Sequence, residues 1–116
     1  MKAKSWRTKI KKLCVAAGTY QPYFDATITA LAEVLEKRDA AEEQYQASGA
    51  NPIVAYTNKG GATNPTRNPM LALWMDLQSD ALRYYETLGL TPAGRNKLGL
   101  SPGPVSAGGK DDLFGD

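Results

Sequence analysis

Residues 68–89, NPMLALWMDLQSDALRYYETLG, carry the clearest helix signal in the sequence and decide its fold class. Asn68 is a favourable N-cap, Pro69 suits the first helical position, and Gly89 is a typical residue to end a helix. The apolar residues of this predicted helix cover about 200° of its circumference, whereas a surface helix of a monomer commonly shows about half of that. We therefore expect the helix to be buried on two sides, one of them covered by another subunit.

A longer helix is predicted over residues 20–48, with Pro22 in its first turn. Its apolar positions alternate in steps of four and three, which is the spacing of a helix that coils against another. Arg38 and Glu42 interrupt this seam, either as surface residues or as a buried pair that sets the register. From both helices we expect these residues at the subunit interface: Leu71, Trp74, Met75, Leu82, Tyr85, Leu31 and Leu35.

The N-terminal segment, residues 1–18, is predicted to form a basic amphipathic helix that Ser5 caps and Gly18 ends. Before Asp25 the chain has six cations and no acid, and a group of acidic residues follows within 33–43. This asymmetry indicates contact with nucleic acid, attraction between neighbouring chains, or simply a solvated basic rim. If DNA is bound, we expect these residues to contact its phosphate backbone: Lys2, Lys4, Arg7, Lys9, Lys11 and Lys12.

Residues 50–67 are predicted to form a small hairpin or loop between the second and third helices. Apolar residues at 53–56 favour a strand, the glycines at 60–61 favour a turn, and Pro65 opposes a long return strand. The spacing of these glycines fits neither the nucleoside-triphosphate P-loop nor the dinucleotide fingerprint. We therefore expect no phosphate-binding chemistry in this segment.

The C-terminal part of the chain divides into a short helix and a tail. Thr91 and Pro92 start the helix, which completes the segment 68–98, and Gly94 is expected to weaken it by about 1 kcal/mol relative to alanine. Residues 99–116 lack periodicity and are predicted to be a disordered tail. The tail either has no role or docks in a partner's groove through two acids and two apolar residues: Asp111, Asp112, Leu113 and Phe114.

Together these segments predict a mainly α fold of three principal helices plus a short C-terminal helix, with a small β-hairpin between helices two and three. Residues 1–98 are expected to form a single helical oligomerisation domain. A chain of 116 residues with eleven glycines and seven prolines has little sequence left for a core, and oligomerisation is a usual remedy for a small core.

The sequence has few residues suited to catalysis, since it contains no histidine and one cysteine, Cys14. An internal disulfide, ordinary zinc sites and histidine-based acid–base catalysis are therefore excluded. Cys14 lies on the apolar side of its helix and is predicted to be a buried structural thiol. The carboxylates show no magnesium-type cluster, and no apolar run reaches the length of a membrane span. We predict a protein with no catalytic residues, no metal site and no cofactor, which is not an enzyme.

The residues NP at 68–69 and LGLTPAGRNKL at 88–98 resemble the small terminase subunit of tailed bacteriophages. The resemblance is to the variety whose Asn-Pro-capped helix ends Leu-Gly-Leu-Thr-Pro-x-x-Arg, and it covers roughly residues 5–98. Gly94 departs from the pattern, because a small helix former is usual there. The residues that match are Trp6, Gly18, Tyr45, Asn68, Pro69, Leu88, Gly89, Leu90, Thr91, Pro92, Arg95 and Leu98.

This resemblance implies a ring-forming, non-catalytic adaptor in the host cytoplasm. Such an adaptor binds double-stranded viral DNA at the start of genome packaging and recruits the large terminase subunit, which holds the ATPase and the nuclease. The alternative is a small dimeric helix-turn-helix transcriptional regulator, although the start of the second helix has almost no basic or amide residues for reading bases. A helical interaction module with no nucleic-acid role is a third reading.

Overall fold

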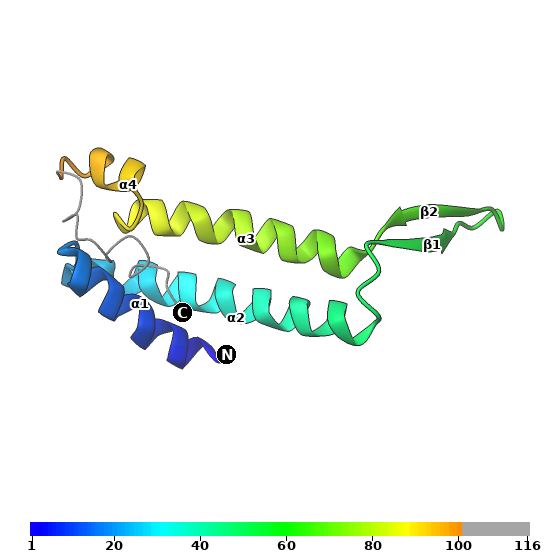
Figure 1. Cartoon of the computed structure of the whole chain (residues 1–116), viewed down its shortest axis with the longest axis horizontal. Coiled ribbons are helices and arrows are strands. Elements are labelled where there is room, and N and C mark those ends of the chain that lie inside the picture. The colour runs from blue at the N-terminus through cyan, green and yellow to red at the C-terminus, as the bar shows by residue number, and fades with distance from the viewer. Residues whose placement is uncertain (101–116) are drawn as a thin grey trace, which may run out of the picture.

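The structure is a computed structural model that describes residues 1–100. In chain order its elements are α1 (Ala3–Ala17), a 3₁₀ turn (Pro22–Phe24), α2 (Asp25–Ala47), β1 (Ile53–Thr57), β2 (Thr63–Arg67), α3 (Pro69–Thr87) and α4 (Pro92–Lys97). Helices α2 and α3 run side by side, α1 packs along α2, and the antiparallel hairpin projects from one end of the pair (Figure 1). The predicted mainly α fold with a hairpin between the second and third helices is confirmed.

The N-terminal helix α1 begins at Ala3, earlier than the sequence predicted. Lys2 holds the N-cap position, and the Ser5 amide donates to the Lys2 carbonyl at 3.0 Å, so the prediction of Ser5 as the cap is wrong. The Glu36 carboxylate of α2 accepts from the Ala3 amide at 3.3 Å, and a negative charge there favours the positive end of the helix dipole. At the other end Gly18, with φ of 75°, terminates the helix as predicted.

The hydrophobic core lies where α1, the C-terminal part of α3 and the turn that follows it meet the first half of α2. Its buried residues are Ile10, Cys14, Phe24, Ile28, Leu31, Ala32, Leu35, Ala81, Leu88 and Leu90. Farther along α2, the Arg38 guanidinium donates to the Gln78 side chain of α3 at 2.9 Å, while Glu42 stays on the surface. The two residues therefore form no buried pair, and Ala41, with 3% of its surface exposed, continues the packed seam instead.

The start of α3 follows the cap chemistry that the sequence predicted. The Asn68 side chain accepts a hydrogen bond from the Met70 amide at 3.0 Å, and Pro69 occupies the first turn. After the helix, Gly89 adopts a left-handed φ of 72°. The chain then turns so that Leu90 enters the core and Thr91 caps α4, accepting from the Gly94 amide at 3.0 Å.

Gly94 has a packing role that its helix propensity does not reveal. A Cβ atom at this position would lie 2.0 Å from the backbone carbonyl oxygen of Glu86, so only glycine allows α4 to approach α3 this closely. From the same short helix, the Arg95 guanidinium donates to the carbonyl of Ala17, at the end of α1, at 2.7 Å. The weak helix is thus held by tertiary contacts on two sides.

Candidate nucleic-acid and subunit interfaces

The outward face of α1 carries a group of basic side chains and no acidic one. All six cations predicted to contact DNA are exposed: Lys2, Lys4, Arg7, Lys9, Lys11 and Lys12. The helical period places Arg7 and Lys11 along one flank of this face, with Lys9 and Lys12 along the other. Within residues 1–100, the ion pairs involve none of these six side chains. Their charge is therefore not neutralised by a carboxylate of the described part of the chain.

Two of these cations lie over aromatic rings. The Lys9 ammonium is 5.2 Å from the centre of the Trp6 ring, and the Lys11 ammonium is 5.0 Å from that of Tyr20. At exposed sites such contacts contribute about 0.5–1 kcal/mol, enough to bias a long side chain towards one position. Both lysines remain exposed in these contacts.

Asp39 of α2 fixes the orientation of α1. Its carboxylate accepts from Trp6 Nε1 at 2.7 Å, from the Met1 ammonium at 3.2 Å and from Arg38 at 3.2 Å. Partial burial raises the pKa of the Asp39 carboxyl, but these hydrogen bonds outweigh burial and hold the pKa below its ordinary value. Asp39 was not predicted as important, because Trp6 lies 33 residues away in the sequence.

This low pKa links α1 packing to pH. Because the pKa of Asp39 is lower in the folded chain than in the unfolded one, its ionised form stabilises the fold above the ordinary pKa of an aspartate. The contribution is lost as the pH falls through the lower, folded-state value. At neutral pH the anchor of α1 is therefore fully ionised.

Cys14 behaves as the sequence predicted. It is completely buried, and burial raises the pKa of its thiol, an effect that the hydrogen bond with Thr19 only partly offsets. A thiol of this kind is protonated at neutral pH and unreactive. It serves as a core residue that holds α1 against the rest of the chain.

The outer face of α3 exposes apolar side chains, as its sequence led us to expect. Leu82 is 53% exposed and Met75 is 44% exposed, and Leu71 lies half-buried on the same flank. We call Leu71, Met75 and Leu82 the α3 stripe. Trp74 and Tyr85 are half-buried beside it, nearer to α2, and burial raises the pKa of the Tyr85 hydroxyl. Leu73, a further apolar side chain of α3, is 43% exposed.

The prediction that Leu31 and Leu35 lie at the subunit interface is wrong. Both side chains have no exposed surface, because they pack inside the chain's own core between α1 and α3. A second copy cannot reach them in this fold. They hold the subunit together, and the exposed residues of α3 are the ones available to a partner.

The arrangement of α1 and α2 differs from that of a helix-turn-helix, in which the two helices cross at about 90–120°. Here the Met1 ammonium meets Asp39 and the Ala3 amide meets Glu36, so the contacts move back along α2 as α1 advances. The two helices form an antiparallel pair, visible in Figure 1. This geometry does not present the second helix for insertion into a major groove.

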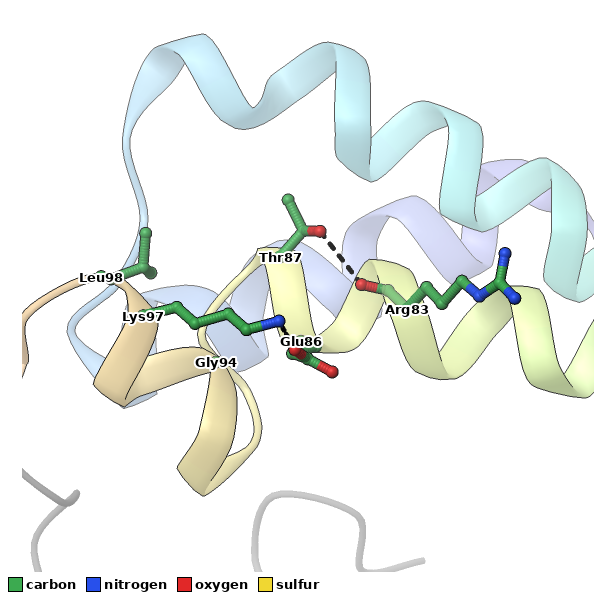
Figure 2. A pocket seen from close by; sticks show the side chains of 6 residues that line it. All are labelled: Arg83, Glu86, Thr87, Gly94, Lys97 and Leu98. Atoms are coloured by element: carbon green, nitrogen blue, oxygen red, sulfur yellow. Dashed lines mark hydrogen bonds and ion pairs between the residues drawn. The ribbon is translucent and has the colours of Figure 1, made fainter.

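An open hollow between α3 and α4 offers no chemistry of its own (Figure 2). Lys97 pairs with Glu86 across it, and the Arg83 side chain points away from it. Within residues 1–100, no group of three His, Cys, Asp or Glu side chains is placed to hold a metal ion. In the same residues, no helix is long and apolar enough to cross a membrane.

Residues 3–104 match the family described as "Phage terminase, small subunit". The chain belongs to this family. Comparison with curated proteins and with solved structures gives no match. Family membership gives the chain a role in phage DNA packaging. This role replaces the alternative interpretation of the sequence, a dimeric transcriptional regulator. In this small terminase subunit the tail residues Asp111, Asp112, Leu113 and Phe114 lie outside the described residues.

Proposed function

We propose that the chain is a non-catalytic adaptor that binds viral DNA through the outer face of α1 and assembles with copies of itself through the α3 stripe. The observation that carries the DNA contact is the row of cations on α1, all exposed and none paired with a carboxylate within residues 1–100. Phosphates along the DNA backbone are the natural partners of such a face. No element of the described chain is shaped for reading bases, so the contact is expected to be largely independent of sequence.

Assembly increases the strength of this contact. One α1 helix offers few phosphate contacts, but several copies held in one ring act on the same DNA, and each further contact becomes intramolecular. A ring also requires that the α3 stripe meet a different surface on the next copy, because identical surfaces would close a dimer. The proposed adaptor therefore needs both the outer face of α1, to bind DNA, and the α3 stripe, to assemble.

The proposal extends to the large terminase subunit and to the setting in which the chain works. We propose that the acidic-apolar tail around Asp111–Phe114 docks in a groove of that subunit, as short apolar motifs commonly do. The chain would then connect viral DNA to the packaging motor in the host cytoplasm. Family membership supports this role, and the tail supplies charge of the opposite sign to α1.

The DNA contact is tested by reversing charge on α1. Lys9→Glu, Lys11→Glu and Lys12→Glu together are expected to weaken binding of a double-stranded DNA fragment at least about tenfold. Losing three phosphate contacts per subunit should also reduce the slope of log affinity against log salt by about 2.7, at about 0.9 per contact. Binding is measured by fluorescence anisotropy at several salt concentrations.

A matched control applies the same change of charge elsewhere. Lys37→Glu, Lys59→Glu and Arg83→Glu together alter three exposed cations that lie outside α1. This control should keep most of the affinity and nearly the full salt slope. If both triple variants lose affinity equally, the whole-chain charge drives binding and the assignment to α1 is wrong.

The subunit contact is tested on the α3 stripe. Met75→Glu and Leu82→Glu together place two charges on the apolar face and are expected to break the ring into species no larger than a dimer, because burying an unpaired charge is costly. Light scattering coupled to size-exclusion chromatography measures the mass. Val15→Glu, at an apolar residue that is 60% exposed on the α1 face proposed for DNA, should leave the mass unchanged. A wild-type chain that is monomeric at micromolar concentration would contradict the proposal.

A further inference from the structure

The β-hairpin extends beyond the helices with almost no support from the rest of the chain. Every residue of both strands is exposed except Val54, which is half-buried. Ile53 is 58% exposed and Tyr56 is 60% exposed, on opposite faces of the hairpin. A two-stranded hairpin alone is at best marginally stable in water, so one that has neither a core of its own nor a covering helix is expected to gain stability from a contact outside the chain.

The pairing of the strands shows which backbone groups are free for such a contact. The Asn58 amide donates to the Ala62 carbonyl at 2.9 Å, and the Asn68 amide donates to the Pro52 carbonyl at 2.8 Å. Since hydrogen-bonded and non-bonded pairs alternate in an antiparallel ladder, the even-numbered residues of the hairpin face inward. The backbone amide and carbonyl groups of the odd-numbered residues therefore point outward, with only a carbonyl at Pro65: Ile53, Ala55 and Thr57 on β1, and Thr63, Pro65 and Arg67 on β2.

The two outer edges differ in their capacity to accept another strand. On β2, Pro65 has no amide hydrogen to offer at the centre of the edge, and Arg67 places a charge at its end. On β1, the sequence IVAYT contains no proline, glycine or charge, and all three outward residues have a donor and an acceptor. Natural sheets protect exposed edges with the features that β2 has and β1 lacks.

We propose that the free edge of β1 pairs with β1 of a second copy of this chain, antiparallel about a twofold axis at Ala55. In this register Ala55 faces its own counterpart, and Ile53 of each copy faces Thr57 of the other. Each facing pair exchanges two backbone hydrogen bonds, so the whole free edge is satisfied. The result is a four-stranded sheet in the order β2, β1, β1, β2, with the two protected edges outside.

The side chains of β1 fit this self-pairing. On the face opposite Ala55, Tyr56 of each copy lies beside Val54 of the other, and a cross-strand pair of an aromatic and a β-branched residue contributes roughly 0.2–1 kcal/mol. The antiparallel arrangement also keeps like charges apart, because it places the two hairpin tips with Lys59 at opposite ends of the sheet.

Pairing of β1 with β2 of a neighbouring copy is the competing geometry. It would extend the hairpins into a meander around a ring, but Pro65 would leave the central acceptor of β1 without a donor. Pairing of β1 with β1 avoids this loss. The proposal is independent of DNA binding and of the α3 stripe, so its failure would leave the proposed function standing.

Cross-linking tests the register directly. Ala55→Cys places one thiol on each copy at the twofold axis, where facing Cα atoms of a hydrogen-bonded pair are about 5.5 Å apart, within the range for a disulfide. Cys14 is completely buried and does not compete. Under mild oxidation the full-length variant is expected to form a disulfide-linked dimer, seen as a doubled mass on a non-reducing gel.

Thr63→Cys is the matched control, since it places an exposed thiol on the other edge of the same hairpin. We expect it to cross-link at least tenfold more slowly than Ala55→Cys. Equal rates for the two variants would overturn the proposal. So would preferential cross-linking between the two variants in a mixture, because that result would indicate pairing of β1 with β2.

A second pair of variants tests the edge without cysteines. Thr57→Lys and Thr63→Lys each remove the hydroxyl–hydroxyl hydrogen bond of 3.0 Å between these residues, so their effects within the hairpin are alike. Only Thr57→Lys adds a charge to the free edge of β1. We expect it to halve the mass of the assembly while Thr63→Lys leaves the mass unchanged; an unchanged mass for Thr57→Lys would overturn the proposal.

Discussion

Replacing Leu35 with alanine is expected to lower the free energy of unfolding by about 2–5 kcal/mol. The side chain has no exposed surface and packs in the core shared by α1, α2 and α3. Its removal loses the free energy of burial and leaves a cavity that the surrounding helices fill only in part. Because small domains are stable by only about 5–15 kcal/mol, a loss of this size is a large part of the total. Urea unfolding followed by circular dichroism measures it.

Leu82→Ala is the matched control for this prediction. It removes the same side chain from α3 at a position that is 53% exposed. At the lowest protein concentration that gives a signal, where contacts between copies contribute least, it should change the free energy of unfolding by less than about 0.5 kcal/mol. A Leu82 effect as large as that of Leu35 would mean that the subunit has no core of its own and folds only when assembled.

Replacing Gly94 with alanine is expected to destabilise the chain by about 1–3 kcal/mol, although alanine is the better helix former by about 1 kcal/mol. The added Cβ would meet the Glu86 carbonyl oxygen at 2.0 Å, and a backbone atom cannot move aside as a flexible side chain can. Helix α4 must therefore shift away from α3. The shift also disturbs the contact of Arg95 with the end of α1.

Asn96→Ala provides the comparison within the same helix. Asn96 is exposed, so alanine there tests propensity without a clash and should be neutral or slightly stabilising. Thermal unfolding of both variants is measured side by side. If Gly94→Ala were as stable as Asn96→Ala, α4 would not approach α3 as closely as described, and the prediction would be wrong.

Local chemistry is the part of this fold that the sequence predicts well. Asn68 and Thr91 cap their helices, and Gly18 and Gly89 adopt left-handed conformations, because each of these effects acts within about four residues. The exception is Ser5, which does not cap α1, because the helix begins earlier, at Ala3. The Glu36 carboxylate, 33 residues from Ala3, accepts from the Ala3 amide and provides a partner for the first turn that local sequence cannot reveal.

Burial was predicted more reliably than the identity of the covering surface. The apolar spacing of α2 correctly indicates that Leu31 and Leu35 are buried, but a periodic pattern does not say whether the same chain or another copy covers them. Gly94 shows the same limit, since its role depends on a carbonyl oxygen of the preceding helix. The exposure of the α1 cations is confirmed, and their contact with DNA stays a prediction.

The hydrogen bond from Arg95 to the Ala17 carbonyl joins residues that are 78 positions apart. A fragment ending at Gly89 would keep all of α1 and every cation on its outer face, yet it would leave the last turn of α1 without this donor. Trimming the chain from its C-terminal side would therefore alter a helix at the opposite end of the sequence. The shortest fragment that preserves the native setting of α1 is one that retains α4.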